Sequence, residues 1–256
     1  MTLSAKDWIF VSDAHFTGRE PGPMEAFLRF LDSEENRIGH LVILGDLFDF
    51  FFGFKNCFSQ EKSSVFIDYI PVFNKLQHFY QNGIQIIYFE GNHDFFLQPF
   101  FSEQFGMEID VYPKGNEEWL EGRRGYIAHG DLSNPRQWTY RVFRKILKNP
   151  LTYRLLRLIG PHISRWAARR ISRRANQKYY DQELDTPHEA FRTFAHQKFL
   201  EGFEVVILGH SHFPEAAEEW VGGKRCLYYN VGDWMVHRSY LRFSPPDRYE
   251  LSRFDG

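Results

Sequence analysis

Two histidines spaced one residue apart follow a short apolar run late in the chain. The run is "EVVILGHSH", residues 204–212, and the histidines are His210 and His212. In an extended segment, residues two apart point to the same side, so the two imidazoles would lie together and are candidates for metal binding. The same pattern also fits a strand end with a turn glycine and two partly exposed histidines. Other segments of the chain distinguish these two interpretations.

Four further apolar runs end in the same kinds of side chain. Each is followed at once by aspartate, asparagine or histidine, and such side chains would converge if the strands share a sheet edge. Imidazole nitrogen and carboxylate oxygen together suit Mn, Fe, Zn or Co better than Ca or a thiolate-bound metal. The pattern therefore predicts a metal centre. Its members are Asp13 and His15, Asp46 with Asp49, Asn92 with His93 and Asp94, and His129.

The apolar runs also predict the fold class, which is α/β. They are short and nearly continuous, as strands buried on both faces are. Helical patterns lie between several of them, at 23–36, 63–81 and 187–202. This alternation favours an active site at the carboxyl ends of the strands. The predicted strands lie within 8–15, 40–46, 84–94, 125–131, 204–212 and 227–233.

The composition is that of an ordinary globular protein. With 256 residues, 43% of them hydrophobic, the chain can bury a core for one elaborated α/β domain or for two domains. Two cysteines, Cys57 and Cys226, are too few for a disulfide framework and fit a reducing compartment. Neither a signal peptide nor an apolar stretch of membrane-spanning length is present in the sequence. These features predict a cytoplasmic protein.

Positive charge is concentrated in one segment. Residues 132–180 contain no acidic residue but 13 of the chain's 31 Lys and Arg, and without them the net charge of −2 would be about −15. Apolar and basic residues alternate at helical spacing from Val142 to Lys148, and Pro150 and Pro161 divide the segment. We therefore predict two or three short amphipathic helices. An apolar face beside a positive face is typical of helices that meet anionic lipid.

The polar clusters carry a family resemblance. In order, "SDAH", "GDLFD", "GNHD", "AHGD" and "GHSH" resemble the five blocks of calcineurin-like metallophosphoesterases, through nearly the whole chain. The resemblance implies a sandwich of two mixed β-sheets flanked by helices, with two divalent ions that share one aspartate. Two such ions hold a phosphoryl group and acidify a water for attack on phosphorus. The implied ligands are Asp13, His15, Asp46 and His212 for one ion, and Asp46, Asn92, His129 and His210 for the other.

The resemblance gives His93 no metal ligand role. It implies that His93 contacts the phosphate or protonates the leaving oxygen, so the catalytic residues would be His93 and Asp46. Asp94 and Asp49 are expected to orient imidazoles from behind the ligands. For Asp49, a structural role as a cap or turn carboxylate stays equally open.

The basic segment resembles that of one branch, the UDP-2,3-diacylglucosamine pyrophosphohydrolases of lipid A biosynthesis. That likeness implies a core of residues 1–133 and 181–256 with a helical cap at 134–180, and Mn²⁺ as the usual metal. It further implies cleavage of a lipid-linked sugar nucleotide to 2,3-diacylglucosamine 1-phosphate and UMP, at the anionic cytoplasmic face of the inner membrane.

The same likeness assigns residues to the substrate. "RRANQK", residues 173–178, resembles the family's headgroup-binding segment, which implies that Arg174, Asn176 and Lys178, together with His93, bind the substrate. Acyl chains would lie between cap and core. The phenylalanine-rich run 47–54 is compatible with lining that chamber and equally with core packing.

One residue departs from the branch and leaves alternatives open. Better-known members have arginine at the position of His93, which leaves open how the phosphates are held and whether the substrate is the same. A metal-dependent phosphodiesterase or nuclease acting on a soluble phosphodiester is the alternative, since basic segments also suit phosphate backbones. No nucleic acid partner is expected, because the insert is rich in Leu, Ile and Val and lacks a base-stacking array. A non-catalytic scaffold is disfavoured by the complete ligand set, and the oligomeric state is not predicted.

Overall fold

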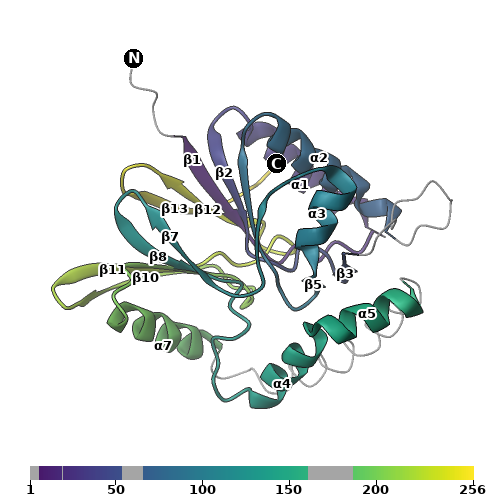
Figure 1. The fold of residues 1–256 in the computed structure, drawn as a ribbon. Coiled ribbons are helices and arrows are strands. Elements are labelled where there is room, and N and C mark those ends of the chain that lie inside the picture. The colour runs from purple at the N-terminus through teal and green to yellow at the C-terminus, as the bar shows by residue number, and fades with distance from the viewer. Residues whose placement is uncertain (1–5, 19, 54–65, 161–186) are drawn as a thin grey trace.

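Two β-sheets packed against each other form the centre of the protein in the computed structural model, which describes residues 6–18, 20–53, 66–160 and 187–256 (Figure 1). In spatial order, the six-stranded sheet contains β13 (Arg248–Arg253), β12 (Ser239–Ser244), β1 (Asp7–Val11), β2 (Ile38–Ile43), β4 (Gln85–Phe89) and β6 (Asp110–Tyr112). The five-stranded sheet contains β10 (Glu215–Val221), β11 (Lys224–Asn230), β9 (Val205–Leu208), β8 (Arg123–Ile127) and β7 (Asn116–Leu120).

Both sheets are mixed, as the resemblance implied. Strands β1, β2, β4 and β6 run parallel, and so do β8, β9 and β11. The outer strands β12, β13, β7 and β10 pair antiparallel with their neighbours. The loops after the parallel strands are where the polar clusters lie in the sequence, so the topology delivers these clusters to one edge of the sandwich.

Helices cover the outer faces of the two sheets. In Figure 1, α1 (Pro21–Glu34), α2 (Ile70–Gln81) and α3 (Leu97–Phe105) lie beside the six-stranded sheet, and α7 (Pro187–Leu200) lies beside the five-stranded one. A 3₁₀ turn, η1 (Ile67–Tyr69), precedes α2, and β3 (Phe51–Phe52) pairs with β5 (Asp94–Phe95). The helices predicted at 23–36 and 187–202 are confirmed, and that at 63–81 is confirmed over its described part.

The alternation of side chains along β2 explains why its run is continuously apolar. Leu41 and Ile43 belong to the core cluster on the helix side, whereas Val42 and Leu44 belong to the cluster between the sheets. All four are fully buried. A strand covered on both faces must be apolar at every position, and each such side chain contributes roughly 1.5–3 kcal/mol of burial free energy.

The phenylalanine-rich run after β2 belongs to the hydrophobic core. Phe48 and Phe51 are fully buried, and their ring centroids lie 4.9 Å from those of Phe73 and Phe100, respectively. Of the two roles left open by the sequence, core packing is therefore correct for the described residues 47–53 of this run. A core position also explains the density of aromatic rings, which fill large volumes with few rotamers.

The basic segment begins with two helices, α4 (Trp138–Leu147) and α5 (Pro150–Ile159), as predicted. Asn149 caps α5 by accepting a 2.8 Å hydrogen bond from the Leu151 amide, and Pro150 occupies the first helical turn. The prediction of a third helix concerns residues outside the described ranges. Figure 1 shows α4 and α5 on one side of the sandwich, beyond β3 and β5.

The basic side chains of α4 do not all face outward. Arg144 is buried and forms an ion pair with Asp131, and its guanidinium also donates to the Pro113 carbonyl at 3.0 Å. Lys148 Nζ lies 3.2 Å from Glu90 Oε2, with both side chains largely buried. The expectation that the cations of this helix form a lipid-facing surface is therefore wrong for these two. They attach α4 to the core.

Replacing Arg144 tests this attachment. Arg144→Met should lower the free energy of unfolding by about 3–5 kcal/mol, because it leaves the Asp131 carboxylate buried without its partner. Urea denaturation monitored by circular dichroism measures the change. Arg225→Met is the matched control, since the Arg225–Glu218 pair is exposed, and its unfolding midpoint should stay near that of the wild type. Equal, small effects of both variants would contradict the structural role of Arg144.

Candidate metal centre

The loops that carry the predicted ligands have an unusual backbone. Eight non-glycine residues in the described ranges have positive φ, and five of them are predicted ligands with φ between 43° and 67°. This left-handed region is unfavourable for residues with a Cβ, so the surrounding structure must impose it. Such conformations cluster at functional sites. The five residues are Asp13, His15, Asp46, His210 and His212.

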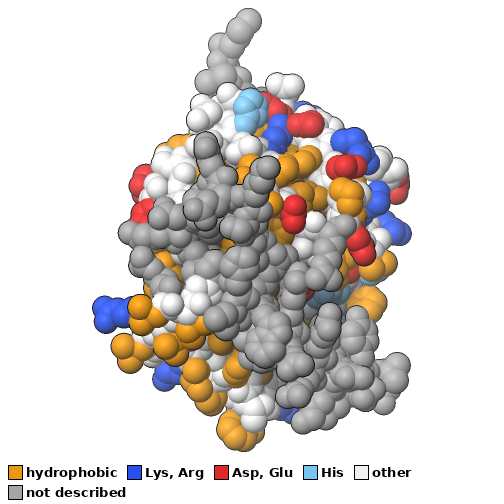
Figure 2. Space-filling model, turned by 90° about the vertical axis from the view of Figure 1, so that its right-hand side faces the viewer, with side chains coloured by type: hydrophobic (Ala, Val, Ile, Leu, Met, Phe, Trp, Pro, Cys, Tyr) orange, Lys and Arg blue, Asp and Glu red, His pale blue; other side chains and the backbone are white. Residues whose placement is uncertain are grey.

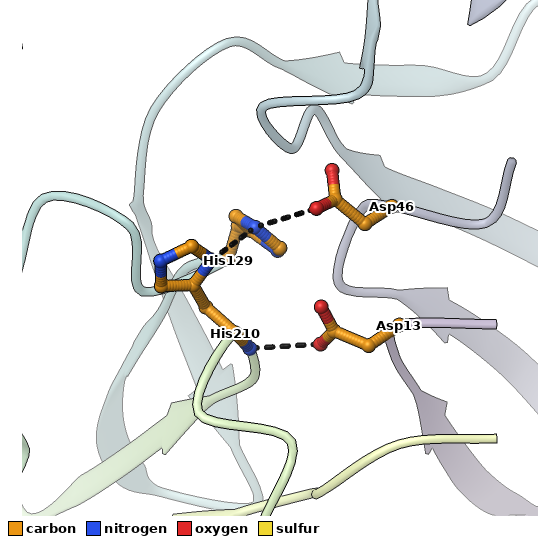
Figure 3. Close-up of side chains that lie close together, drawn as sticks. All are labelled: Asp13, Asp46, His129 and His210. Atoms are coloured by element: carbon orange, nitrogen blue, oxygen red, sulfur yellow. Dashed lines mark hydrogen bonds and ion pairs between the residues drawn. The ribbon is translucent and has the colours of Figure 1, made fainter. Parts of the chain in front are cut away.

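Asp46 lies between the two predicted ligand sets. Its Oδ2 atom is 3.7 Å from His15 Nε2 and 3.5 Å from His129 Nε2. The same His129 nitrogen is 3.1 Å from Asn92 Oδ1 and 3.1 Å from His210 Nδ1. Figure 3 shows Asp46, His129 and His210 turned toward one another. This is the position that a carboxylate shared by two ions would require.

Asp13 forms the other half of the cluster. Its Oδ1 atom lies 3.6 Å from His15 Nε2 and 3.4 Å from His212 Nε2, and its Oδ2 atom accepts a 2.8 Å hydrogen bond from the His210 amide. Ligand-type atoms of Asp13, Asp46, His129 and His210 lie within 4.8 Å of one another, and so do those of Asp13, His15 and His212. Asp13 therefore approaches both sets. The structure brings all seven predicted ligands together.

The cluster has the properties of a divalent metal site. Asp13 Oδ1 and His15 Nε2 are buried and have no hydrogen-bond partner, which is unfavourable unless a ligand satisfies them. His129 Nδ1 lies 2.6 Å from the Leu44 carbonyl, which can only accept, so Nδ1 carries a hydrogen and Nε2 is the ring nitrogen available to a metal in the cluster. Imidazole and carboxylate donors suit Mn, Fe, Zn or Co.

The electrostatics of the cluster favour positive charge. Burial raises the pKa of Asp46, but the surrounding imidazoles, His129 foremost, together outweigh burial and bring that pKa well below its usual range. Burial lowers the pKa of His129, but Asp46 outweighs this and raises it to about 10. Burial and the charge on His129 lower the pKa of His210 to about 4. With no cation bound, the ionised carboxylates favour a second proton on His129, at Nε2. A cation bound at Nε2 would displace that proton.

His93 lies at the rim of the cluster. Its amide donates to Asp46 Oδ1 at 2.8 Å, and its ring lies edge-on to that of His15 with centroids 4.7 Å apart. His93 Nδ1 donates to the Asp49 carbonyl, which leaves Nε2 as the ring nitrogen available to substrate. Asp49 therefore orients this imidazole through its backbone. Ligand-type atoms of His15, Asp49 and His93 also lie within 4.8 Å of one another.

Asp94 accepts hydrogen bonds from backbone amides and a tyrosine hydroxyl. It does not orient an imidazole, so the sequence prediction for this residue was wrong. Its Oδ2 atom accepts hydrogen bonds from the Leu47 amide at 2.9 Å and the Tyr88 hydroxyl at 2.6 Å. Its Oδ1 atom accepts from the Gly91 amide at 2.9 Å. One buried carboxylate thereby fixes the loops that carry Asp46 and Asn92.

Two glycines of the motifs are required by close approach. A Cβ on Gly91 would lie 1.9 Å from Asp46 Oδ1, and a Cβ on Gly209 would lie 2.0 Å from Ser12 Oγ. No side chain fits at either place. Gly91 therefore lets the loops after β2 and β4 of the six-stranded sheet meet, and Gly209 lets the loop after β9 meet the loop after β1 in the other sheet.

Two buried aspartates near the cluster escaped the sequence analysis. Asp131 accepts from the Tyr140 hydroxyl at 2.6 Å and pairs with Arg144, which joins the loop after β8 to α4. Asp233 lies 3.8 Å from the ring of His212. Both follow a glycine at the end of an apolar run, as Asp46 does, and this shared pattern was a signal for them. The predicted substrate residues Arg174, Asn176 and Lys178 lie outside the described ranges.

A two-sheet sandwich with aspartate and histidine clustered at its strand ends is the arrangement of a protein with a candidate metal-binding centre. Residues 9–214 match the family model for calcineurin-like phosphoesterases, so this chain belongs to that family. A solved structure from Streptococcus pneumoniae, a predicted phosphoesterase, aligns with a TM-score of 0.42 and 12% identity over 99% of this chain and 92% of that chain.

Curated relatives are similar over most of their length. UDP-2,3-diacylglucosamine hydrolase from Psychromonas ingrahamii is 27% identical over 239 residues, which is 91% of each chain. The protein of the same name from Pectobacterium carotovorum is 29% identical over 245 residues, which is 93% of this chain and 95% of the relative. The similarity thus includes the segment between the fourth and fifth motifs.

Removing Asp46 tests the shared position. Asp46→Ala should bind neither of two divalent ions, because both ligand sets lose a carboxylate oxygen, and activity should fall by several orders of magnitude. Metal content of the purified chain, measured by inductively coupled plasma mass spectrometry, reports the result. Asp32→Ala, which removes an exposed surface carboxylate, is the control and should keep the wild-type metal content. Two ions per chain with near-normal turnover in Asp46→Ala would refute the assignment.

Proposed function

We propose that this protein is a metal-dependent hydrolase that cleaves the pyrophosphate of UDP-2,3-diacylglucosamine to 2,3-diacylglucosamine 1-phosphate and UMP, a reaction of lipid A biosynthesis. The observation that carries the substrate is similarity over about nine-tenths of both chains to relatives named for it. The cluster of seven ligand-type side chains supports the reaction class. The residues that build it occupy the five blocks of a phosphoester-cleaving family.

In this proposal the ligand sets are those that the family resemblance implies. Asp13, His15, Asp46 and His212 would hold one divalent ion, and Asp46, Asn92, His129 and His210 the other, with Mn²⁺ as the expected metal. When bound, the two ions would supply Lewis acidity toward the phosphoryl oxygens and an acidified water. Leu44 supports this role by fixing the His129 tautomer through its carbonyl.

His93 is the proposed catalytic side chain outside the ligand set. Its Nδ1 hydrogen is engaged by the Asp49 carbonyl and its amide by Asp46, so the ring is held in one orientation. The Nε2 atom, protonated, can donate to a phosphate oxygen or to the leaving oxygen. A positioned acid of this kind contributes about 10²–10⁴-fold to a rate.

Analysis of reaction products tests the proposal. Purified protein with Mn²⁺ and UDP-2,3-diacylglucosamine should yield UMP and the lipid sugar 1-phosphate, both identified by mass spectrometry. His93→Ala should keep both metal ions yet lower the rate by roughly 10²–10⁴, since it removes only the proton donor. Absence of both products with a metal-loaded wild type that cleaves a small aryl phosphodiester would instead favour the soluble phosphodiesterase alternative.

The apolar sides of α4 and α5 support a membrane-surface location. Leu151, Leu155 and Leu158 on α5 are 69%, 56% and 85% exposed, and Val142 and Ile146 on α4 are more than half exposed. Figure 2 shows hydrophobic side chains gathered at the lower edge of the face that includes these helices. No helix within the described ranges is both long and apolar enough to span a bilayer. We propose that this surface contacts the anionic cytoplasmic face of the inner membrane.

For the described residues of α4 and α5, the proposed membrane contact would depend mainly on burial of apolar side chains. Arg144 and Lys148 are engaged by core acids, so they contribute little to attraction by anionic lipid or by a nucleic acid backbone. The other basic residues of 134–180, with Arg174, Asn176 and Lys178 toward the sugar and phosphates, remain part of the proposal. Each basic residue near an anionic surface contributes about 1 kcal/mol.

Charged substitutions on α5 test the membrane contact. The double variant Leu155→Asp, Leu158→Asp should bind vesicles of phosphatidylethanolamine and phosphatidylglycerol at least tenfold more weakly, because it places charge on a surface that would be buried in lipid. Cosedimentation measures the bound fraction. Leu200→Asp, at an equally exposed leucine on α7, is the matched control and should bind as the wild type does. Undiminished binding by the α5 variant would contradict the location.

A further inference from the structure

Asp233 is a buried acid beside the metal centre that belongs to neither proposed ligand set. It follows β11 and is only 2% exposed. Its Oδ1 atom accepts hydrogen bonds from the Val236 amide at 2.7 Å and the His237 amide at 2.9 Å. Its Oδ2 atom faces two imidazoles, with His237 Nδ1 at 3.3 Å and His212 Nδ1 at 3.8 Å. One oxygen thus shapes the loop, and the other hydrogen-bonds with His237 and also lies near a proposed metal ligand, His212.

The loop that carries Asp233 is anchored firmly. Trp234 is fully buried, and its indole Nε1 donates to the Pro23 carbonyl at 3.2 Å. The Trp234 amide donates to the Asp13 carbonyl at 3.2 Å, and Ser239 Oγ donates to the Val231 carbonyl at 2.6 Å. The Asp233 carboxylate therefore has a defined position relative to the metal cluster.

The His212 ring is less enclosed by protein than the rings of His15 and His129, so it depends more on a neighbour that orients it. Its side chain is 35% exposed, compared with 12% for His15 and 1% for His129. His129 is fixed by the Leu44 carbonyl, and His212 has the Asp233 carboxylate in the corresponding place, at Nδ1. A carboxylate only accepts, so it favours a hydrogen on Nδ1 and leaves the lone pair on Nε2. That Nε2 atom lies 3.4 Å from Asp13 Oδ1, inside the cluster.

We propose that Asp233 is a positioning residue that orients His212 for metal binding and sets its tautomer, and so determines the affinity of the ion that His212 helps to hold. The inference rests on the proposed ligand set. At 3.8 Å the contact is longer than a hydrogen bond, so Asp233 acts on the His212 ring through its negative charge, which favours a hydrogen on Nδ1. His237, the second imidazole beside the same oxygen, has no metal role.

Titration of the full-length, metal-free chain with Mn²⁺ tests the proposal. Asp233→Asn keeps a carbonyl oxygen for the two loop amides but removes the negative charge that faces His212. One Mn²⁺ should bind as in the wild type and the second about 10–100-fold more weakly, the usual effect of losing a carboxylate behind a ligand histidine. Isothermal titration calorimetry gives both affinities. Electron paramagnetic resonance should show the coupled two-manganese signal weakening at stoichiometric metal.

Two comparisons separate orientation of His212 from a purely structural role. His237→Ala removes the other partner of the same oxygen and should bind Mn²⁺ as the wild type does. The melting temperature of metal-free Asp233→Asn should stay near that of the wild type. Wild-type affinities in Asp233→Asn would overturn the proposal. Equal weakening of both ions with a lowered melting temperature, or weakening in His237→Ala, would overturn it as well.

The measurement is independent of the substrate. Failure to release UMP from the sugar nucleotide would count against the proposed function and would leave the Mn²⁺ isotherms unchanged. A wild-type chain that binds no Mn²⁺ would instead refute the ligand set, and the role of Asp233 with it.

Discussion

The structure depends on two carboxylates, Asp13 and Asp46, held ionised where the sheets meet. Each is buried, and an isolated buried carboxylate is strongly unfavourable unless donors and positive charge surround it. Backbone amides and imidazoles supply both here, through His210 and His93 on one side and His129 on the other. The positive φ angles of the ligand-carrying loops, and the glycines that allow these loops to approach closely, are explained by this need for donors. Such a backbone brings the donors close to both carboxylates.

The two sheets make different chemical contributions to the centre. Loops of the six-stranded sheet supply the carboxylates and the asparagine amide, together with His15. Loops of the five-stranded sheet supply three imidazoles, His129, His210 and His212. Neither sheet alone offers a complete donor set, so a bound cation would join the two halves of the sandwich. The loop after β11 adds a further tie, since Trp234 donates to the Asp13 carbonyl while Asp233 faces His212.

The helices α4 and α5 depart from the usual arrangement of an amphipathic surface helix at several positions. Buried cations attach α4 to core acids, and apolar side chains face outward. In the proposed membrane location, a lipid surface would cover these exposed apolar side chains. Because Asp131 follows the proposed ligand His129 by two residues, the ion pair that holds α4 also supports the loop that carries His129. The proposed membrane contact and the candidate metal centre are thus physically connected.

Much of the centre was predictable because its signals are local. A strand followed at once by Asp, Asn or His can be recognised within five or six residues of sequence. Asp13, Asp46, His129 and His210 were therefore predicted as candidate ligands without any coordinates. The α/β class followed from the same runs. Residues that act through distant partners gave weaker signals. Asp233 is far in sequence from His212, the side chain that it faces. Asp94 reaches the Leu47 amide only because two loops meet in the folded chain.

The sequence alone determined which side chains are available for metal chemistry, where β1, β2, β4, β8, β9 and β11 lie, and that one segment is basic and amphipathic. Each of these depends on the order of neighbouring residues. Only the tertiary structure decided that the phenylalanines after β2 fill the core, that Arg144 and Lys148 turn inward, and that Asp13 approaches both ligand sets. These outcomes depend on which buried charges and surfaces meet across long sequence separations. The periodicity of residues along the chain does not indicate which distant residues will be paired.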